Sequence, residues 1–416
     1  MMNKDAQPIT PGKCEGVKVC MIVNQIYYTD TRVMSYANAL AQAGAQVDII
    51  ASRYPDRGEP KQHRNIKVYS IPVARNYQSG LGYILNYIVS TLFFIVYASA
   101  LYFKRRYDVM HIHNMPDTLI LAALLPRLFG AKAILDIHDP MPNVFMSKYH
   151  REANSVLVRL FEMQEKISTW LADEVITANP LFKDLLVQRG VPAEKILVVN
   201  NIPNPSLFNR EKVIAAIDEP RDKFTLIFPG TIAPRYGLDI AIRALPKLCK
   251  EISGLCLKVI GKHTHHSEEL MALACELGVS AYLNFVPFVP AEQISVEIAR
   301  SDVGIYTALP DAHMSIAMPI KVLEYVTMGI PVVASRLPIL EAFFDETAIL
   351  FFTPGNVDEF AAHVLRLYRD HSLRSKLAER ATNMLLSTYS WKEEFERYLQ
   401  LIHKLKETTL NAPIKG

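Results

Sequence analysis

The stretch PIKVLEYVTMGIPVVA at residues 319–334 decides the fold, because it reads as a helix that leads directly into a buried strand. Pro319 suits the first turn of a helix, and Val332–Ala334 has the continuous apolar pattern of a strand that is covered on both faces. One predicted strand precedes this helix at 303–306, and another follows the pair at 348–352. Strand–helix–strand units of this kind predict a parallel α/β sheet.

The same alternation extends outward over nearly the whole chain and divides into two series. The first series ends at NNIPNP (200–205), whose Asn and Pro residues indicate a turn between domains. We therefore predict two doubly wound domains, residues 1–205 and 206–388, and a segment 389–416 that carries an amphipathic helix and no further strand. The predicted strands are 17–23, 46–51, 66–71, 108–113, 132–137, 174–178 and 196–199 in the first domain and 224–228, 255–260, 282–286, 303–306, 332–334 and 348–352 in the second. The predicted helices of the second domain are 238–251, 268–277, 291–299, 319–328 and 357–368.

The composition is that of a protein with large buried cores. Half of the 416 residues are hydrophobic and 21% are charged, which excludes an intrinsically disordered chain. The net charge of +3 disfavours nucleic acid as a partner. Basic residues exceed acidic residues by five within 1–208, which points to a membrane surface or an anionic acceptor. The five cysteines form no C-x-x-C pair, so we expect neither a disulfide framework nor a zinc ribbon, and a reduced cytosol is the expected compartment.

One stretch of the first domain, residues 81–103, has no charged residue over 23 positions and is followed by Lys104, Arg105 and Arg106. A helix of this length can span a bilayer. Predicted strands of one sheet flank the stretch, however, and a span would separate them across the membrane. Three interpretations follow: a buried core helix, a transmembrane helix, and a helix in the membrane interface with its basic cluster at the headgroups. We favour the interfacial helix.

The second domain has a first candidate binding segment directly after its strand 224–228. In doubly wound domains, ligands bind at the carboxyl ends of the strands. Gly230 allows close approach of the backbone to a ligand, while Thr231 and Arg235 can donate hydrogen bonds to phosphate oxygens. The alternative is an ordinary turn with a surface arginine.

A second candidate segment is the predicted helix 319–328. Lys321 and Glu324 are three residues apart and therefore share one face of this helix. Near the helix N-terminus, Lys321 can meet a phosphate, and Glu324 can accept hydrogen bonds from the two hydroxyls of a ribose. The alternative is an exposed salt bridge between the two residues, which the apolar strands on both sides disfavour.

Histidines mark two further strand ends. His138 lies between Asp136 and Asp139 at the end of strand 132–137, where it can hydrogen-bond a substrate or simply cap the loop. His111 and His113 alternate with apolar residues, so we predict that they are packed in the core.

Three more histidines, His263, His265 and His266, follow Gly261 after strand 255–260. No nearby Cys and no carboxylate at a convincing spacing completes a metal-ligand set, so a flexible loop over a nucleotide is favoured over a metal site. The chain also has no P-loop motif, no complete G-x-G-x-x-G and no D-x-D triplet, which disfavours P-loop NTPases and ordinary dinucleotide oxidoreductases.

Together these segments resemble the glycosyltransferases of family 4, retaining enzymes built on the GT-B fold. The resemblance covers nearly the whole chain and rests on Asp30–Val33, Asp136–Asp139, Gly230–Gly237 and Pro319–Ala334. It implies two tandem Rossmann-like domains, of which the second binds a nucleotide-sugar donor and the first an acceptor, with the reaction in the cleft between them. It also implies that the terminal helix crosses back onto the first domain.

The resemblance implies a role for each candidate residue. Glu324 matches the glutamate that holds the ribose, and His138 matches the histidine that faces the transferred sugar. Arg235 and Lys321 are the cations expected at the diphosphate, so His138, Arg235 and Lys321 are the candidate catalytic residues. Cations and a helix dipole would neutralise the leaving diphosphate, so neither a metal nor a cofactor is expected. The expected donor-binding residues are Gly230, Thr231, Arg235, Gly261, Lys321 and Glu324.

Two departures from the family pattern affect the donor site. The family often has an acid eight residues before the ribose glutamate, where this chain has Ile316, and Asp311 from the same loop is a possible substitute. The usual Arg and Lys of the Gly230 loop are replaced by Thr231 and Tyr236, which leaves Arg235 as the cation of that loop.

We therefore expect a metal-independent glycosyltransferase of the hexosyltransferase type. Its expected acceptor is a lipid-linked glycan in the synthesis of a cell-surface polysaccharide, and its expected place is peripheral, at the cytosolic face of the membrane. One alternative is a nucleotide-sugar 2-epimerase on the same fold. Another is a catalytically inactive scaffold of a polysaccharide assembly complex. The replacement of the family's acidic residue by Ile316 favours this scaffold, whereas the retained Lys321 and Glu324 disfavour it.

Overall fold

The computed structural model describes residues 12–53, 63–71, 81–215 and 223–410. The chain divides into two units, one formed by Met1–Asn201 with Lys392–Gly416 and the other by Ile202–Trp391. The divisions therefore fall within four residues of the boundaries expected from the sequence, 205 and 388.

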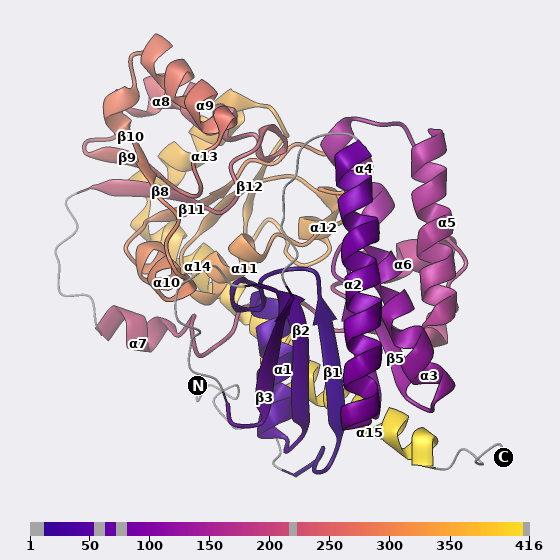
Figure 1. Ribbon diagram of the computed structural model, residues 1–416. Coiled ribbons are helices and arrows are strands. Elements are labelled where there is room, and N and C mark those ends of the chain that lie inside the picture. The colour runs from indigo at the N-terminus through magenta and orange to yellow at the C-terminus, as the bar shows by residue number, and fades with distance from the viewer. Residues whose placement is uncertain (1–11, 54–62, 72–80, 216–222, 411–416) are drawn as a thin grey trace. The chain divides into compact units, whose positions relative to one another are not determined.

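The first unit contains a parallel sheet of seven strands in the order β3-β2-β1-β4-β5-β6-β7 (Figure 1). Its helices are α1 to α6, with 3₁₀ segments between them. The strands are β1 Lys18–Val23, β2 Gln46–Ser52, β3 Ile66–Ile71, β4 Val109–His113, β5 Lys132–Ile137, β6 Glu174–Thr177 and β7 Ile196–Val198. The helices are α1 Thr31–Gln42, α2 Leu81–Arg105, α3 Leu124–Leu128, α4 Met141–Tyr149, α5 Val156–Leu171 and α6 Pro180–Gln188, and the 3₁₀ segments are η2 Tyr27–Thr29, η3 Asp117–Ala123 and η4 Ala193–Lys195.

The second unit contains a parallel sheet of six strands in the order β10-β9-β8-β11-β12-β13. Each strand predicted from the sequence is present in the two sheets, with its ends within two residues of the prediction. The strands are β8 Phe224–Pro229, β9 Leu255–Ile260, β10 Leu283–Val286, β11 Val303–Tyr306, β12 Val332–Ser335 and β13 Leu350–Phe352. The helices are α7 Arg210–Ala215, α8 Leu238–Leu248, α9 His265–Glu276, α10 Ala291–Ala299, α11 Ile320–Thr327, α12 Pro338–Glu341, α13 Val357–Arg369 and α14 His371–Thr388, with 3₁₀ segments η5 Pro234–Tyr236 and η6 Ser280–Tyr282.

The helix α14 was not predicted from the sequence. Its buried residues are two leucines and two alanines, Leu377, Ala378, Ala381 and Leu385, among many polar and charged positions, so the apolar stripe is weak. The terminal helix α15 (Trp391–Leu410) belongs mainly to the first unit, as the crossover helix of a GT-B chain does. Its Glu394 accepts hydrogen bonds from the backbone and side-chain nitrogens of Asn200, at 2.8 and 3.0 Å.

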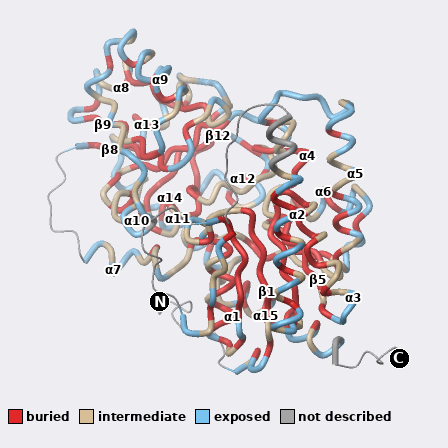
Figure 2. Tube along the Cα trace, in the orientation of Figure 1, coloured by how far each residue is buried: buried red, intermediate tan, exposed pale blue. Residues whose placement is uncertain are grey.

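The long helix α2 is neither fully buried nor free on all sides. Phe94, Ala98 and Tyr102 pack into the core of the first unit, whereas the opposite face exposes apolar side chains, among them Val96 at 69% (Figure 2). The interpretation as a buried core helix is therefore wrong for this face. Among the described residues, α2 is the one helix long and apolar enough to cross a membrane, and one third of its apolar window is buried.

Candidate functional site

The site in the second unit begins where β8 and β9 end. The backbone nitrogen of Gly230 donates to the carbonyl of Ile260 at 2.8 Å, and Gly230 has φ +119°, a conformation that favours glycine. A Cβ atom on Gly261 would lie 2.4 Å from the carbonyl oxygen of Gly230. Gly261 is therefore required for the two strand ends to approach each other. Gly230 and Gly261 together form a surface of backbone atoms without side chains.

The side chain of Lys321, from helix α11, reaches this backbone surface. Its Nζ would lie 3.2 Å from a Cβ atom placed on Gly230. The helix is fixed by the hydroxyl of Tyr325, which donates to the carbonyls of Ile227 in β8 and Ile305 in β11 at 3.1 and 3.3 Å. Gly230, Gly261 and Lys321 therefore lie close together, because the segments that carry them follow parallel strands that end at the same edge of the sheet.

The ammonium group of Lys321 is enclosed by aromatic rings. Its Nζ lies 3.7 Å from the ring centre of Phe228, 4.8 Å from that of Tyr236 and 5.9 Å from that of Tyr306. Lys321 is buried, and its Nζ has no hydrogen-bond partner within the part of the chain that the structure describes. Aromatic faces stabilise the charge only in part, so the group remains available to an anion.

Burial opposes charge on both Lys321 and Glu324. Burial lowers the pKa of Lys321 to about 7, although the nearby charge of Glu324 acts in the other direction. Burial likewise raises the pKa of Glu324 to about 7, against the effect of Lys321. No ion pair joins the two side chains in the described structure, so the exposed salt bridge considered above does not form. Groups with such shifted pKa values cluster at functional sites.

Arg235 lies on η5, beside the same aromatic ring that contacts Lys321. Its guanidinium carbon is 5.3 Å from the ring centre of Tyr236. The carbonyl of Arg235 accepts from the backbone nitrogen of Leu309 at 3.0 Å, which ties η5 to the loop after β11. The Nε of Arg235 has no hydrogen-bond partner among the described residues, and Thr231 is exposed in the same turn. Both predicted cations therefore lie around Tyr236.

Asp311 lies in the loop that follows β11. The Oδ1 atom of Asp311 accepts from the backbone nitrogens of His313 and Met314, both at 2.7 Å, so this oxygen holds the loop together. Contact of Asp311 with a donor sugar in place of Ile316 stays a prediction.

Two of the three histidines after β9 are helical, because α9 begins at His265, after the N-cap Thr264, whereas His263 lies in the loop before it. His265 and His266 pair with Glu268 and Glu269 one turn further on, at 3.4 and 2.7 Å. These are pairs along one helix surface. The expectation of a flexible segment over a nucleotide was therefore wrong for His265 and His266.

His138 of the first unit belongs to a buried charged network centred on Asp136. Asp136 accepts from Nη2 and Nε of Arg32 at 3.1 and 3.3 Å, and its Oδ2 lies 3.2 Å from Nε2 of His138. The backbone nitrogen of His138 donates to Oδ1 of Asn114 at 2.9 Å, which fixes the loop. Nε2 of His138 thus faces the protein, and Nδ1 is the ring nitrogen left for a substrate.

The two histidines of β4 complete this network. His111 and His113 are fully buried, as predicted, and Nδ1 of His111 lies 2.9 Å from the hydroxyl of Tyr398 in α15. His111, His113 and Asp136 bring possible ligand atoms within 4.8 Å of one another. A cation does not fit there, because both oxygens of Asp136 already accept from the positive guanidinium of Arg32.

The charges in the network set the pKa values of its members. Burial disfavours the charged form of His138, but the charge of Asp136 and its hydrogen bond outweigh burial, so the pKa of His138 is raised. Burial lowers the pKa of His113 in spite of the same carboxylate. Burial alone would raise the pKa of Asp136, yet Arg32 and His138 hold it well below its usual range.

Comparison with known proteins places these two sites in one family. Residues 29–201 match the family described as "Glycosyl transferase 4-like domain", and residues 209–384 match "Glycosyl transferases group 1". The chain is a family 4 glycosyltransferase. Between them the two matches span both units and include His138, Arg235, Lys321 and Glu324.

Two relatives of this glycosyltransferase are themselves named as glycosyltransferases. An uncharacterized glycosyltransferase of Methanocaldococcus jannaschii is 24% identical over 69% of this chain and 72% of its own length. A GDP-mannose-dependent alpha-(1-6)-phosphatidylinositol monomannoside mannosyltransferase of Mycolicibacterium smegmatis is 25% identical over 45% of this chain and 49% of its own.

Solved structures give the same fold. Sucrose-phosphate synthase from Thermosynechococcus elongatus superposes with a TM-score of 0.78 over 94% of this chain and all of that chain, at 16% identity. An Anabaena protein solved with UDP and glucose superposes with a TM-score of 0.64 over 93% of this chain and 100% of its own, also at 16% identity. The glycosyltransferase therefore has the predicted GT-B fold.

Sequence reasoning missed the residues that support the candidate side chains. Arg32 lies in the first turn of α1, and the sequence shows no signal that it reaches Asp136, which is 104 residues away. Phe228 and Tyr306 looked like ordinary strand residues. A signal was present, however, because each ends a strand next to a segment already singled out.

Proposed function

We propose that this glycosyltransferase moves a sugar from a nucleotide-sugar donor to a lipid-linked glycan without a metal ion, as a retaining enzyme at a membrane surface. The observation that carries the donor assignment is the ammonium group of Lys321. It is buried beside the open backbone of Gly230, with no hydrogen bond or ion pair to any described residue. A diphosphate supplies the missing negative charge.

The leaving group determines what the cations contribute. When the bond between the sugar and the diphosphate breaks, negative charge grows on the diphosphate oxygens. Lys321 and Arg235, which both lie around Tyr236, stabilise that charge more in the transition state than in the ground state. Two fixed cations in a partly dehydrated site replace the charge that a metal would supply.

Glu324 and His138 have binding roles in this proposal. Glu324, one helical turn after Lys321, accepts hydrogen bonds from the ribose hydroxyls in its ionised form. His138 presents Nδ1 to the transferred sugar, while Asp136 holds Nε2 and fixes the ring. The Anabaena protein of the same fold was solved with UDP and glucose, which supports UDP as one of the nucleotides to test.

The affinity for a nucleoside diphosphate is expected to fall by up to about tenfold per pH unit above pH 7, because Lys321 must be protonated to bind it. The second phosphate pKa is about 6, so the ligand itself is fully ionised in this range. Calorimetric titration of UDP, GDP and ADP at pH 7, 8 and 9 measures the effect. Lys321→Met removes this group and should bind weakly, with an affinity that no longer falls above pH 7, because the remaining titration of Glu324 favours binding as the pH rises. The same steep slope in Lys321→Met would assign the titration to another group.

Two helices of the first unit support the membrane part of the proposal. The outer face of α2 exposes Ile88, Leu92 and Val96 by 52–69%. Helix α5 buries polar residues and exposes apolar residues, which is the reverse of the pattern in an ordinary surface helix. Its buried face includes Glu165, Ser168 and Thr169, whereas an apolar stripe is exposed. That stripe consists of Val156, Leu160, Met163, Ile167 and Trp170, at helical spacing.

An exposed apolar stripe of this kind is typical of a helix that lies on lipid. Exposed basic residues accompany it, since Arg159 and Lys166 lie on α5 and Lys104 follows the apolar part of α2. Trp170, exposed by 76%, has the amphipathic ring that favours the headgroup region. The mycobacterial relative is named for a phosphatidylinositol mannoside, which supports an acceptor held in a membrane.

Charge reversal of Lys104 and Arg106 is expected to lower binding to anionic vesicles by at least about tenfold, since each basic residue near the surface contributes about 1 kcal/mol. Arg105 is left unchanged. Its Nε lies 3.2 Å from Asp48, and it donates to the hydroxyl of Tyr69 at 3.0 Å, so it stabilises the fold. Flotation with phosphatidylglycerol vesicles measures binding of Lys104→Glu/Arg106→Glu.

A matched control carries the same change of net charge on the second unit, at the exposed Lys250 and Lys376. Lys250→Glu/Lys376→Glu should float like the unmodified protein. If the unmodified protein ignores anionic vesicles, the membrane proposal fails. If the Lys104/Arg106 variant still requires detergent for release, α2 spans the membrane instead of lying on it.

A further inference from the structure

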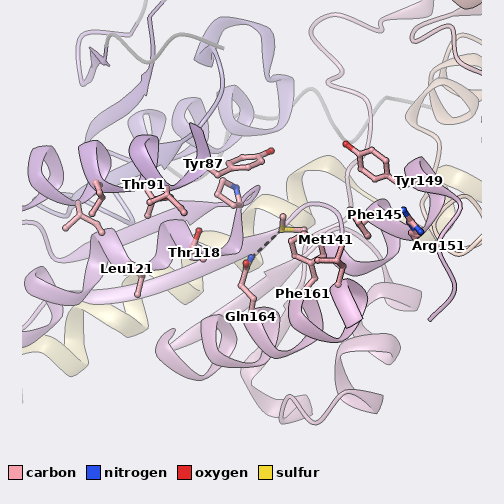
Figure 3. A pocket seen from close by; sticks show the side chains of 15 residues that line it. Tyr87, Thr91, Thr118, Leu121, Met141, Phe145, Tyr149, Arg151, Phe161 and Gln164 are labelled. Atoms are coloured by element: carbon pink, nitrogen blue, oxygen red, sulfur yellow. Dashed lines mark hydrogen bonds between the residues drawn. The ribbon is translucent and has the colours of Figure 1, made fainter. Parts of the chain in front are cut away.

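A cavity of about 530 Å³ opens in the first unit between α2, η3, α4 and α5 (Figure 3). This volume lies within the range of roughly 300–1,000 Å³ that is usual for small-molecule sites. The cavity has no part in the donor site, whose residues all belong to the second unit. It is lined mainly by apolar and aromatic side chains, among them Leu92, Ile95, Leu121, Met141, Phe145 and Phe161.

The polar groups in the cavity offer little to a polar ligand. Gln164, from α5, directs its Nε2 toward the sulfur of Met141 at 3.4 Å, as the dashed line in Figure 3 shows. Thr91 and Thr118 contribute small side chains on the α2 and η3 walls, and Tyr87 and Tyr149 contribute aromatic rings that carry one hydroxyl each. A nucleotide or a free sugar needs several hydrogen bonds in its site, and this lining does not supply them. A hydrocarbon chain needs none.

The walls of the cavity continue into the exposed apolar faces of α2 and α5. Ile88 and Leu92 line the cavity and are exposed by 52% and 56%, and Leu157 on the α5 side is exposed by 46%. A chain can therefore pass between the surface proposed to contact lipid and the cavity without crossing a polar barrier. Arg151, also in the lining, forms no ion pair with any described residue and provides a cation for an anionic headgroup.

We propose that this cavity binds the hydrocarbon chain of a single anionic lipid, the lipid that carries the acceptor, with the lipid phosphate at Arg151. The inference rests on the proposed function and deepens it, because it states how the first unit selects an acceptor attached to lipid. The apolar cavity takes the chain, and Arg151 takes the charge next to it.

The test uses decyl phosphate below its micellar concentration as the probe, in calorimetric titrations of the full chain. The unmodified protein should bind one equivalent, and butyl phosphate should bind at least tenfold more weakly. Thr118→Trp fills the cavity from η3 and should lower the affinity for decyl phosphate at least tenfold. Val96→Asn changes an exposed apolar residue of α2 outside the lining and should leave that affinity unchanged.

Leu121→Trp is a second filling variant, in case Thr118→Trp fails to fold as judged by circular dichroism. Arg151→Gln should weaken decyl phosphate binding and leave binding of decanol unchanged. Equal affinity in folded filling variants, or no saturable binding to the unmodified protein, would overturn the proposal. Sedimentation that shows a dimer which excludes the probe would also overturn it, because a second copy would then cover the cavity.

These outcomes are separable from failure of the proposed function. Nucleotide titration and vesicle flotation are measured on the same protein. If both succeed and decyl phosphate does not bind, the cavity proposal alone is wrong. If decyl phosphate binds in the cavity and no nucleotide binds to the second unit, the proposed function is wrong.

Discussion

Replacing Lys321 by methionine is expected to lower kcat for donor cleavage by about 10²-fold or more, with a smaller loss of donor affinity. Methionine keeps an apolar stem of similar length against Phe228 and removes the charge that lies 3.7 Å from that ring. The loss falls on kcat because negative charge on the diphosphate is largest as the glycosidic bond breaks. Arg235→Gln is expected to act in the same direction.

Release of nucleotide from the sugar donor, in excess chelator, measures this effect. Lys250→Met is the matched control, because Lys250 is exposed on the same unit just after the C-terminus of α8 and is not one of the site residues. It should retain full activity. If Lys321→Met and Arg235→Gln together leave kcat intact, fixed cations do not stabilise the leaving group, and this account of the site is wrong.

Replacing Asp136 by asparagine is expected to lower the free energy of unfolding by about 3–5 kcal/mol, since it leaves a buried positive charge without its partner. Arg32 and Asp136 are both buried, and Asp136 also holds His138. Chemical denaturation at pH 7 measures the change. Asp184→Asn, on the exposed side of α6, is the control and should alter the unfolding free energy by less than about 0.5 kcal/mol.

The pH dependence identifies the cause. The pKa of Asp136 is held well below its usual range in the folded chain, against about 3.9 when unfolded. Its stabilising effect is therefore complete above about pH 4 and is lost as the pH falls through the folded pKa. Because Asp136 also raises the pKa of His138, the difference between the unmodified protein and Asp136→Asn should be largest near pH 5 and decrease as the pH rises through the pKa of His138. Adding Arg32→Met to Asp136→Asn should recover stability, and no recovery would show that the pair is not the cause.

Much of the fold is readable from the sequence because buried parallel strands are nearly continuous apolar runs, such as Leu255–Ile260. The donor site is readable for a related reason. Segments that follow parallel strands meet at one edge of a sheet, which is why Gly230, Gly261 and Lys321 converge in the structure. Local sequence and topology together were sufficient there.

The remaining features depend on contacts that local sequence does not specify. Helix α5 exposes its apolar stripe and buries Glu165 against Arg189 at 3.0 Å. Which face of α5 is covered depends on Arg189, the partner of Glu165, which lies 24 residues further along the chain. The same holds for Asp136, whose partner Arg32 comes from another element. The role of a buried charge such as Glu165 or Asp136 can therefore be assigned only when its partner in the structure is known.

The central claim is that the second unit binds a nucleoside diphosphate through the cations Lys321 and Arg235 and through Glu324. Calorimetric titration of UDP, GDP and ADP in excess EDTA, with the unmodified protein and Glu324→Ala, tests it most directly. We predict that one of these nucleotides binds without metal and that Glu324→Ala weakens its binding by about 1–3 kcal/mol, through loss of a charged hydrogen bond to the ribose. Failure of all three to bind in EDTA, or equal affinity in Glu324→Ala, would contradict the claim.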